Sequence, residues 1–148
     1  MFKLSQRSIN NLKGTKPQLQ DVVSRAIQLT EVDFVVIEGL RSIARQQELV
    51  RQGASQTMNS KHITGDAVDL AAWLGTIRWE MSFYFKIAEA MKQAAIENNV
   101  AIRWGGAWSV NDIRTYSGTM EHAHEAYLAL RRSQGRRAFI DGPHFELM

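Results

Sequence analysis

The chain has 148 residues, a formal net charge of +3 and 45% hydrophobic residues, which is the balance of an ordinary globular domain. The absence of cysteine excludes disulfides, thiolate metal sites and a cysteine nucleophile, so any metal must be held by imidazole and carboxylate groups. Because there is no internal repeat, low-complexity run or Pro/Gly/Ser-rich linker, we expect residues 1–148 to form one domain.

Two helices are predicted near the N-terminus. Residues Ser5 to Leu12 form a short helical pattern that ends at Gly14. A second helix begins at Pro17, since proline suits the first turn of a helix. The apolar residues of this second helix recur at amphipathic spacing: Leu19, Val22, Val23, Ala26 and Ile27.

The middle of the chain predicts two strands with a helix between them. The run from Phe34 to Ile37 is rich in β-branched residues and indicates a strand. Ser42 can cap a helix that runs to about Gln52, with Gly53 at its end. After a polar loop, a second strand is expected around Ala67 to Leu70.

The second half adds two more helices and two more strands. A long helix is indicated by apolar residues at helical spacing: Trp79, Phe83, Ile87, Ala90, Met91 and Ala94. A strand at Val100 to Trp104, a helix around Ala123 to Leu130 and a strand at His144 to Leu147 follow. Helices around a small sheet of about four strands predict an α+β fold.

Alternation along two of these strands points to a site. Val68 and Leu70 share one face of their strand, while Asp69 lies on the other. In the last strand, Phe145 faces one way and His144 the opposite way. If both apolar faces contact the core, Asp69 and His144 converge on the other side of the sheet.

A third ligand candidate, His62, lies just upstream of Asp69. The turn at Thr64-Gly65 can fold His62 back over Asp69. Two histidines and one carboxylate, with His144 as the second histidine, are typical of one catalytic zinc ion that keeps a coordination position for water.

Asp141 is the candidate base. On a regular strand Asp141 and His144 would diverge, but Gly142-Pro143 breaks that regularity and can turn both side chains into one pocket. A carboxylate beside a zinc-activated water can accept its proton during attack on a peptide bond.

These motifs resemble a known family. The pattern Ser-x-His-x-x-Gly-x-Ala-x-Asp, followed by Asp-x-x-His, is similar to the VanY-like branch of the D-Ala-D-Ala peptidase/hedgehog superfamily, and especially to phage L-alanyl-D-glutamate endopeptidases, which are endolysins. The likeness is carried by four blocks of the chain: Glu38 to Ser42, Ser60 to Leu70, Arg103 to Trp108, and Asp141 to Leu147.

The resemblance implies a small, mainly antiparallel sheet with one zinc ion on His62, Asp69 and His144. It implies that Asp141 is the catalytic acid/base and that Arg41 stabilises the oxyanion. Ser60 is then expected to bind substrate, and Glu146, on the same face as His144, to support a ligand. The implied activity is hydrolysis of the peptidoglycan stem at the L-alanyl-D-glutamate bond, as in phage lysis.

Two alternatives stay open from the sequence. One is a carboxypeptidase of the same superfamily that removes the terminal D-alanine of the stem. The other is a zinc-bearing binding module without turnover, which the presence of both Asp141 and Arg41 disfavours.

The surroundings of the enzyme can also be predicted. The first residues lack the apolar stretch of a signal peptide, so we expect synthesis in the cytoplasm, no membrane span, and holin-type release to the cell wall. We expect a monomer with no nucleic-acid partner. The cluster Arg131, Arg132, Arg136 and Arg137 is interpreted as a solvated helix end.

Residues 111–140 form a long connection compared with the small members of the family and are expected to carry an extra helix. This helix holds His122 and His124. Histidines two positions apart point about 200° apart around a helix, so they cannot share one ion. Both are therefore expected to be surface residues.

Overall fold

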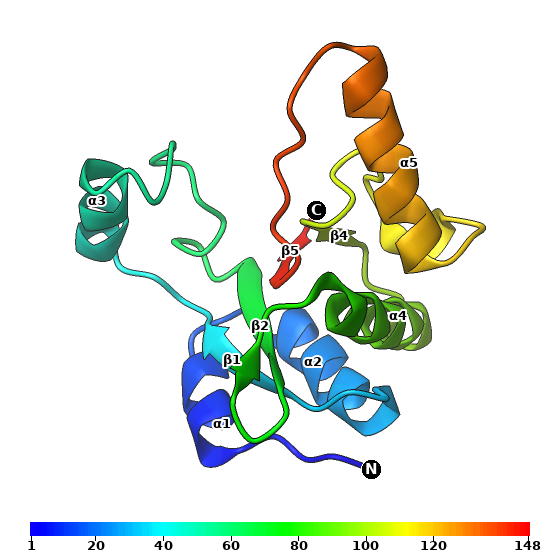
Figure 1. The fold of residues 1–148 in the computed structure, drawn as a ribbon. Helices are drawn as coiled ribbons and strands as arrows, with labels where there is room; N and C mark the ends of the chain where they lie inside the picture. The colour runs from blue at the N-terminus through cyan, green and yellow to red at the C-terminus, as the bar shows by residue number, and fades with distance from the viewer.

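A computed structural model describes all 148 residues, and it contains five α-helices, one 3₁₀ helix and five strands (Figure 1). In chain order these are α1 (Gln6–Leu12), α2 (Pro17–Leu29), β1 (Phe34–Glu38), α3 (Ile43–Arg51), β2 (Ala67–Trp73), β3 (Ile77–Arg78), α4 (Met81–Asn98), β4 (Ile102–Trp104), η1 (Ile113–Thr115), α5 (Met120–Ser133) and β5 (His144–Leu147).

Local sequence signals account for most helix ends. The hydroxyls of Ser5, Ser42 and Thr119 each accept a hydrogen bond from a backbone N–H in the first turn of α1, α3 and α5. Asn99 adopts the left-handed conformation and ends α4. The predicted elements and the α+β class are confirmed.

The sheet places its strands in the order β1-β2-β5-β4, and all pairs are antiparallel. The short β3 pairs with the end of β2. In the register of β2 with β5, Asp69 lies opposite His144 and Val68 lies opposite Phe145. In this register, Asp69 and His144 lie on one face of the sheet, and Val68 and Phe145 lie on the other face.

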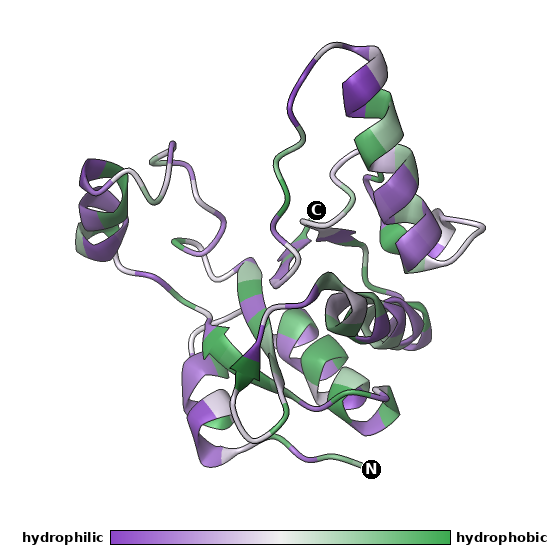
Figure 2. Ribbon diagram, in the orientation of Figure 1, coloured by the Kyte–Doolittle hydropathy of each residue, from purple (hydrophilic) through white to green (hydrophobic).

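The core lies between the sheet and the helices α2 and α4, which pack against each other. The helix α2 buries the five apolar residues that its spacing predicted. In Figure 2, β1 is hydrophobic and α2 carries both hydrophobic and hydrophilic residues, whereas the upper end of α5 is hydrophilic. None of the helices combines the length and the apolar composition that crossing a bilayer requires.

Two details differ from the sequence prediction. Trp79 precedes α4 and is exposed, although its spacing continues the apolar stripe of that helix. The reason is that Ile77 and Arg78 pair with β2 as β3, so the chain is extended just before Trp79. The strand β3 and the 3₁₀ helix were not predicted, since neither has a periodic pattern of its own.

The expected helix within residues 111–140 is α5, which projects away from the sheet (Figure 1). The return segment from its tip runs back to β5. His122 is exposed as expected, but the expectation for His124 was wrong. Its ring is buried against Phe85 and Trp104, and its Nδ1 lies 2.6 Å from the carbonyl oxygen of Gly106.

Candidate metal centre

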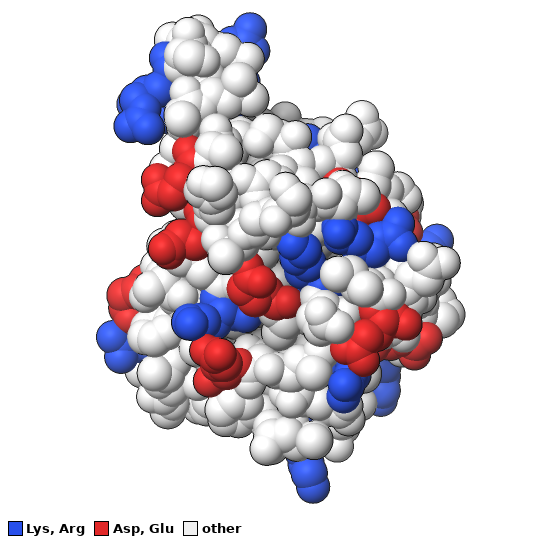
Figure 3. All heavy atoms as spheres, turned by 90° about the vertical axis from the view of Figure 1, so that its right-hand side faces the viewer, with Lys and Arg blue, Asp and Glu red and all other residues white.

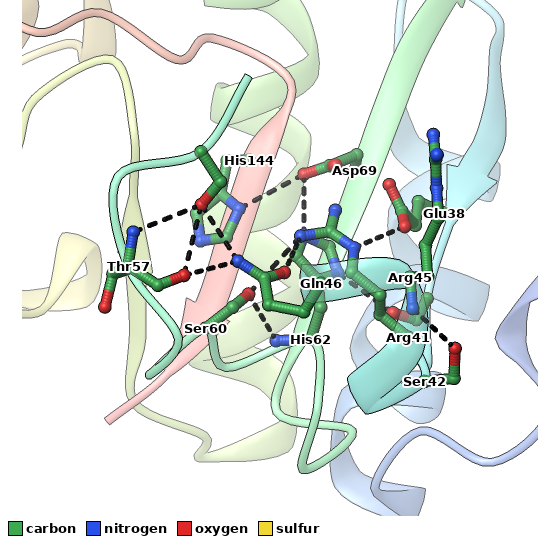
Figure 4. Close-up of polar contacts among 12 residues, drawn as sticks. Glu38, Arg41, Ser42, Arg45, Gln46, Thr57, Ser60, His62, Asp69 and His144 are labelled. Atoms are coloured by element: carbon green, nitrogen blue, oxygen red, sulfur yellow. Dashed lines mark hydrogen bonds and ion pairs between the residues drawn. The ribbon is translucent and has the colours of Figure 1, made fainter. Parts of the chain in front are cut away.

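Strand pairing brings Asp69 and His144 together. Because the two residues are register partners on β2 and β5, their side chains emerge side by side on the same face. The Oδ1 atom of Asp69 lies 3.1 Å from Nδ1 of His144. The predicted convergence of these two residues is found in the structure (Figure 4).

His62 reaches the same point from a turn, as its position before Thr64-Gly65 predicted. Gly65 has a φ of +77°, and a Cβ atom there would lie 2.7 Å from the carbonyl oxygen of Gly14, so only glycine fits. The Nε2 atom of His62 lies 3.2 Å from Oδ1 of Asp69. The three candidate ligand atoms lie within 4.8 Å of one another.

The neighbours of both histidines fix which ring nitrogen carries a proton. Nδ1 of His62 lies 2.8 Å from the carbonyl oxygen of Gly39, which can only accept, so His62 donates there and turns the lone pair of Nε2 toward Asp69. Nε2 of His144 lies 2.8 Å from Oε1 of Glu146, so in the neutral form of His144 the proton on Nε2 leaves the lone pair of Nδ1 facing Asp69 in the same way.

With neutral imidazoles, this arrangement points two nitrogen lone pairs and a carboxylate oxygen at one place. Such a donor set repels itself unless a cation lies between the atoms. Two imidazoles and one carboxylate, each held by a further hydrogen bond, are what zinc sites in enzymes use. The residues present therefore fit a zinc ion.

The titration of the cluster follows from the same contacts. Burial alone would raise the pKa of Asp69, but the hydrogen bonds and charges of His144 and His62 hold that pKa far below its usual range. Burial alone would lower the pKa of His144, yet its hydrogen bonds with Asp69 and Glu146 raise the pKa to about 9. The carboxylates of Asp69, Glu146 and Asp141 thus place negative charge around His144, which favours a cation at this point, either a proton or a metal ion.

Asp141 is held beside the ligands by the turn that the sequence predicted. The N–H of His144 donates to the carbonyl oxygen of Asp141 at 3.1 Å, which closes the turn through Gly142-Pro143. Gly105 forms backbone hydrogen bonds with both residues. Its N–H donates to the carbonyl oxygen of His144, and its carbonyl oxygen accepts from the N–H of Asp141. A Cβ atom on Gly105 would lie 2.2 Å from the carbonyl oxygen of Asp141, so the close approach needs glycine.

The side chain of Asp141 makes no hydrogen bond within the protein, unlike those of Asp69 and Glu146. Burial and the negative charge of Asp69 raise the pKa of Asp141, while the charges of His144, His62 and Arg41 lower that pKa. A carboxyl group with a raised pKa and no internal partner can take up and release a proton more readily than an ordinary surface aspartate.

Arg41 approaches the site from the loop after β1. Its guanidinium donates to Oε1 of Glu38 at 2.5 Å, to Oε1 of Gln46 at 2.7 Å, and to the hydroxyl of Ser60 at 3.5 Å (Figure 4). Only 10% of the Arg41 side chain is exposed. The structure thus brings Ser60 to Arg41, and the Ser60 hydroxyl also accepts from the N–H of His62.

Sequence reasoning missed Gln46, a fully buried residue of α3. Its Oε1 accepts from Arg41, and its Nε2 donates to the Ser55 hydroxyl at 2.9 Å and to the Thr57 carbonyl at 2.6 Å. The sequence did offer one signal. Gln46 is three positions from both Ile43 and Leu49, so it shares a helix face with two apolar residues, and a glutamine on such a face is a candidate for burial.

Two further residues line the site next to His144. The ring of Trp108 lies 5.5 Å from the ring of His144, between centroids. Lys61 forms an ion pair with Glu146 at 3.4 Å, so the lysine steadies the carboxylate that holds His144. Lys61 has no spacing signal in the sequence, because its partner lies on a strand at the other end of the chain.

The chain is also similar in sequence to known proteins. The model of the family described as phage L-alanyl-D-glutamate peptidase matches residues 1–127. The L-alanyl-D-glutamate peptidase of Escherichia phage T5 is 34% identical over 115 residues, which cover 74% of this chain and 84% of that protein. The peptidoglycan L-alanyl-D-glutamate endopeptidase CwlK of Bacillus subtilis is 29% identical over 105 residues, or 62% of this chain and 63% of that protein.

A solved structure is similar over nearly the whole chain. The crystal structure of the Serratia marcescens L-Ala D-Glu endopeptidase ChiX has a TM-score of 0.73 and 36% sequence identity. The likeness covers 99% of this chain and 90% of that one. The fold around the candidate site is therefore shared with a solved endopeptidase.

Proposed function

The chain belongs to the phage L-alanyl-D-glutamate peptidase family, and from this premise we propose that it uses one zinc ion to cut peptidoglycan stems. The bond cut is the one between L-alanine and D-glutamate, as the names of the relatives state for those proteins. The observation that carries the zinc assignment is the convergence of His62 Nε2, Asp69 Oδ1 and His144 Nδ1 with both histidine tautomers set for it.

The proposed role of each residue follows from its position in the site. Zinc held by these three side chains would polarise the scissile carbonyl and acidify a water molecule. Asp141 accepts a proton at its carboxylate during attack and returns it to the departing amine of D-glutamate. Its lack of an internal hydrogen-bond partner supports this role.

Arg41 is proposed to hold the negative charge that develops on the carbonyl oxygen. Its guanidinium is fixed by Glu38 and Gln46, so its position is set before substrate arrives. The Ser60 hydroxyl next to it is proposed to bind the substrate backbone.

We propose that the protein acts as an endolysin of a phage or prophage, as a monomer. It reaches the wall from the cytoplasm after holin-type release. Cutting next to the first residue of the stem suits this role, because it detaches the crosslinked peptides from the sugar strand.

The test is mass spectrometry of purified peptidoglycan after digestion with zinc-loaded protein. We expect muramic acid that carries only L-alanine, together with released peptides that have a new D-glutamate amino terminus. Free D-alanine as the sole product would replace this proposal with the carboxypeptidase. Binding without any product would favour the non-catalytic module.

A further inference from the structure

The excess of positive over negative charge lies in one projecting part, the α5 arm, defined here as residues 128–140. The arm contains Arg131, Arg132, Arg136 and Arg137 and no acidic residue. These four arginines exceed the net charge of +3, so the rest of the chain carries a net charge of −1. At the top of Figure 3, at the height of the α5 tip in Figure 1, only Lys and Arg colour the surface.

Pairing within the protein does not account for these charges. None of the four arginines forms an ion pair with an acidic side chain. Arg131 and Arg132 lie in the last turn of α5, where the helix dipole favours them. Arg136 and Arg137 lie beyond Gly135, outside the helix, and both are exposed.

The arm is fixed relative to the metal centre. The hydroxyl of Tyr127 donates to the carbonyl oxygen of Phe139 at 3.0 Å and accepts from the N–H of the same residue at 3.2 Å. The Phe139 ring stacks on Trp108 at 6.3 Å, and Trp108 in turn lies beside His144. The arginine-bearing segment therefore leads directly to Asp141 in a set orientation.

We propose that the α5 arm is a docking surface for the free carboxylates of peptidoglycan stems adjacent to the one being cut. The inference rests on the proposed function, since it takes the wall polymer as the occupant. The arginines are complementary to carboxylates, and the arm and the metal centre are connected by residues 138–141, so one polymer can contact both.

Docking at a second point keeps the enzyme near uncut stems between turnovers. A polymer held by the arm presents its neighbouring stems to the site at a raised effective concentration. The attraction acts over about 10 Å at about 0.1 M salt, which matches an exposed surface rather than a buried pocket.

The test compares Arg136→Glu/Arg137→Glu with a matched control, Lys3→Glu/Arg7→Glu. Both pairs are exposed and change the charge equally. The control residues belong to the N-terminal segment and α1, which lie at the opposite end of the molecule from the tip of α5 in Figure 1. All are made in the Asp141→Asn background, so that binding to purified sacculi is measured by co-sedimentation without digestion. We expect the arm variant to lose about tenfold or more in affinity and the control to bind as the parent does.

Two further measurements identify the anion that the α5 arm binds. Amidating the carboxyl groups of the sacculi should weaken binding of the parent, and vesicles of anionic phospholipid should not compete. Equal binding by the arm and control variants would overturn the proposal. Competition by vesicles together with unchanged binding to amidated sacculi would also overturn it, in favour of a phosphate surface.

Failure of the docking surface is distinguishable from failure of the proposed function. With Asp141 restored, the Arg136→Glu/Arg137→Glu protein should show a fall in sacculus digestion that exceeds any fall on soluble stem fragments. Digestion of neither substrate by the unaltered protein would refute the peptidase instead. Equal loss on both substrates would refute the docking surface, and matched melting temperatures verify that the variants are folded.

Discussion

The two sides of the metal centre are held in different ways. On the strand side, Asp69 and His144 are placed by the pairing of β2 with β5, and Glu146 continues the same face. On the loop side, Arg41 and Ser60 belong to irregular segments. The Arg41 side chain depends on hydrogen bonds to Glu38, Gln46 and Ser60. Backbone pairing thus fixes two of the three proposed metal ligands, while side-chain contacts place Arg41 and Ser60, which are proposed to meet the substrate.

The difference indicates that metal binding and substrate turnover can be separated by substitution. His62 lies at the boundary, since its chain segment is a loop but its ring faces the strand side. A change on the strand side should remove zinc, and a change on the loop side should leave zinc in place.

The largest effect is expected from the ligands themselves. His62→Ala, Asp69→Ala and His144→Ala should each lose zinc and more than about 100-fold of activity, because even residues that only support a ligand are worth about 10- to 100-fold. Zinc content and sacculus digestion are the measurements, and Lys86→Ala, at an exposed ion pair with Glu31, is the control. Chelation should abolish lysis and added zinc should restore it. Full activity in verified metal-free protein would contradict the mechanism.

The next effect separates the base from the ligands. Asp141→Asn should retain near-stoichiometric zinc yet lose about 10²- to 10⁴-fold of turnover, the usual contribution of a general acid/base. Zinc content and kcat on a soluble stem fragment measure this. If the variant binds no zinc, Asp141 is itself a ligand, and if it cuts normally, Glu146 is the next candidate base.

A smaller effect is expected from Glu146 on the strand side. Glu146→Gln removes the charge that holds Nε2 of His144, so zinc affinity should fall by about 10- to 100-fold. Competition with a zinc chelator of known affinity measures this. Activity at saturating zinc should recover most of the loss. A variant with unchanged affinity would show that the tautomer of His144 is set without Glu146.

The smallest effect tests the loop side. Gln46→Leu removes one of the acceptors of the Arg41 guanidinium, so kcat/KM should fall about tenfold, or ~1.4 kcal/mol, while zinc affinity is unchanged. Loss of the buried hydrogen bonds should also cost about 1–3 kcal/mol in the free energy of unfolding. Gln52→Leu, an exposed substitution just after the same helix, is the control. Loss of zinc from Gln46→Leu would break the proposed separation of the two sides.

The strand side of the site could be predicted from the sequence, whereas much of the loop side could not. The strand side could be predicted because alternation in residues 67–70 and 144–147 assigns each side chain to a face without knowledge of the partner strand. The core positions of α2 could be predicted for the equivalent reason at helical spacing.

Contacts between irregular segments could not be predicted in this way. Gln46 reaches Thr57 across a loop, and Lys61 reaches Glu146 across most of the chain, so no local period relates them. His124 was misassigned because helical geometry gives its direction but not the surface that packs there, which includes Phe85 and Trp104.

The register that pairs Asp69 with His144 also has a kinetic consequence. The two residues are 75 positions apart, so the loop between them must close before their strands can pair. Contacts of such long range form slowly compared with helices, so β5 should join the sheet after α1 and α2 have formed. A partly folded chain therefore lacks the complete set of proposed ligands, so the proposed zinc ion would stabilise only the finished native state.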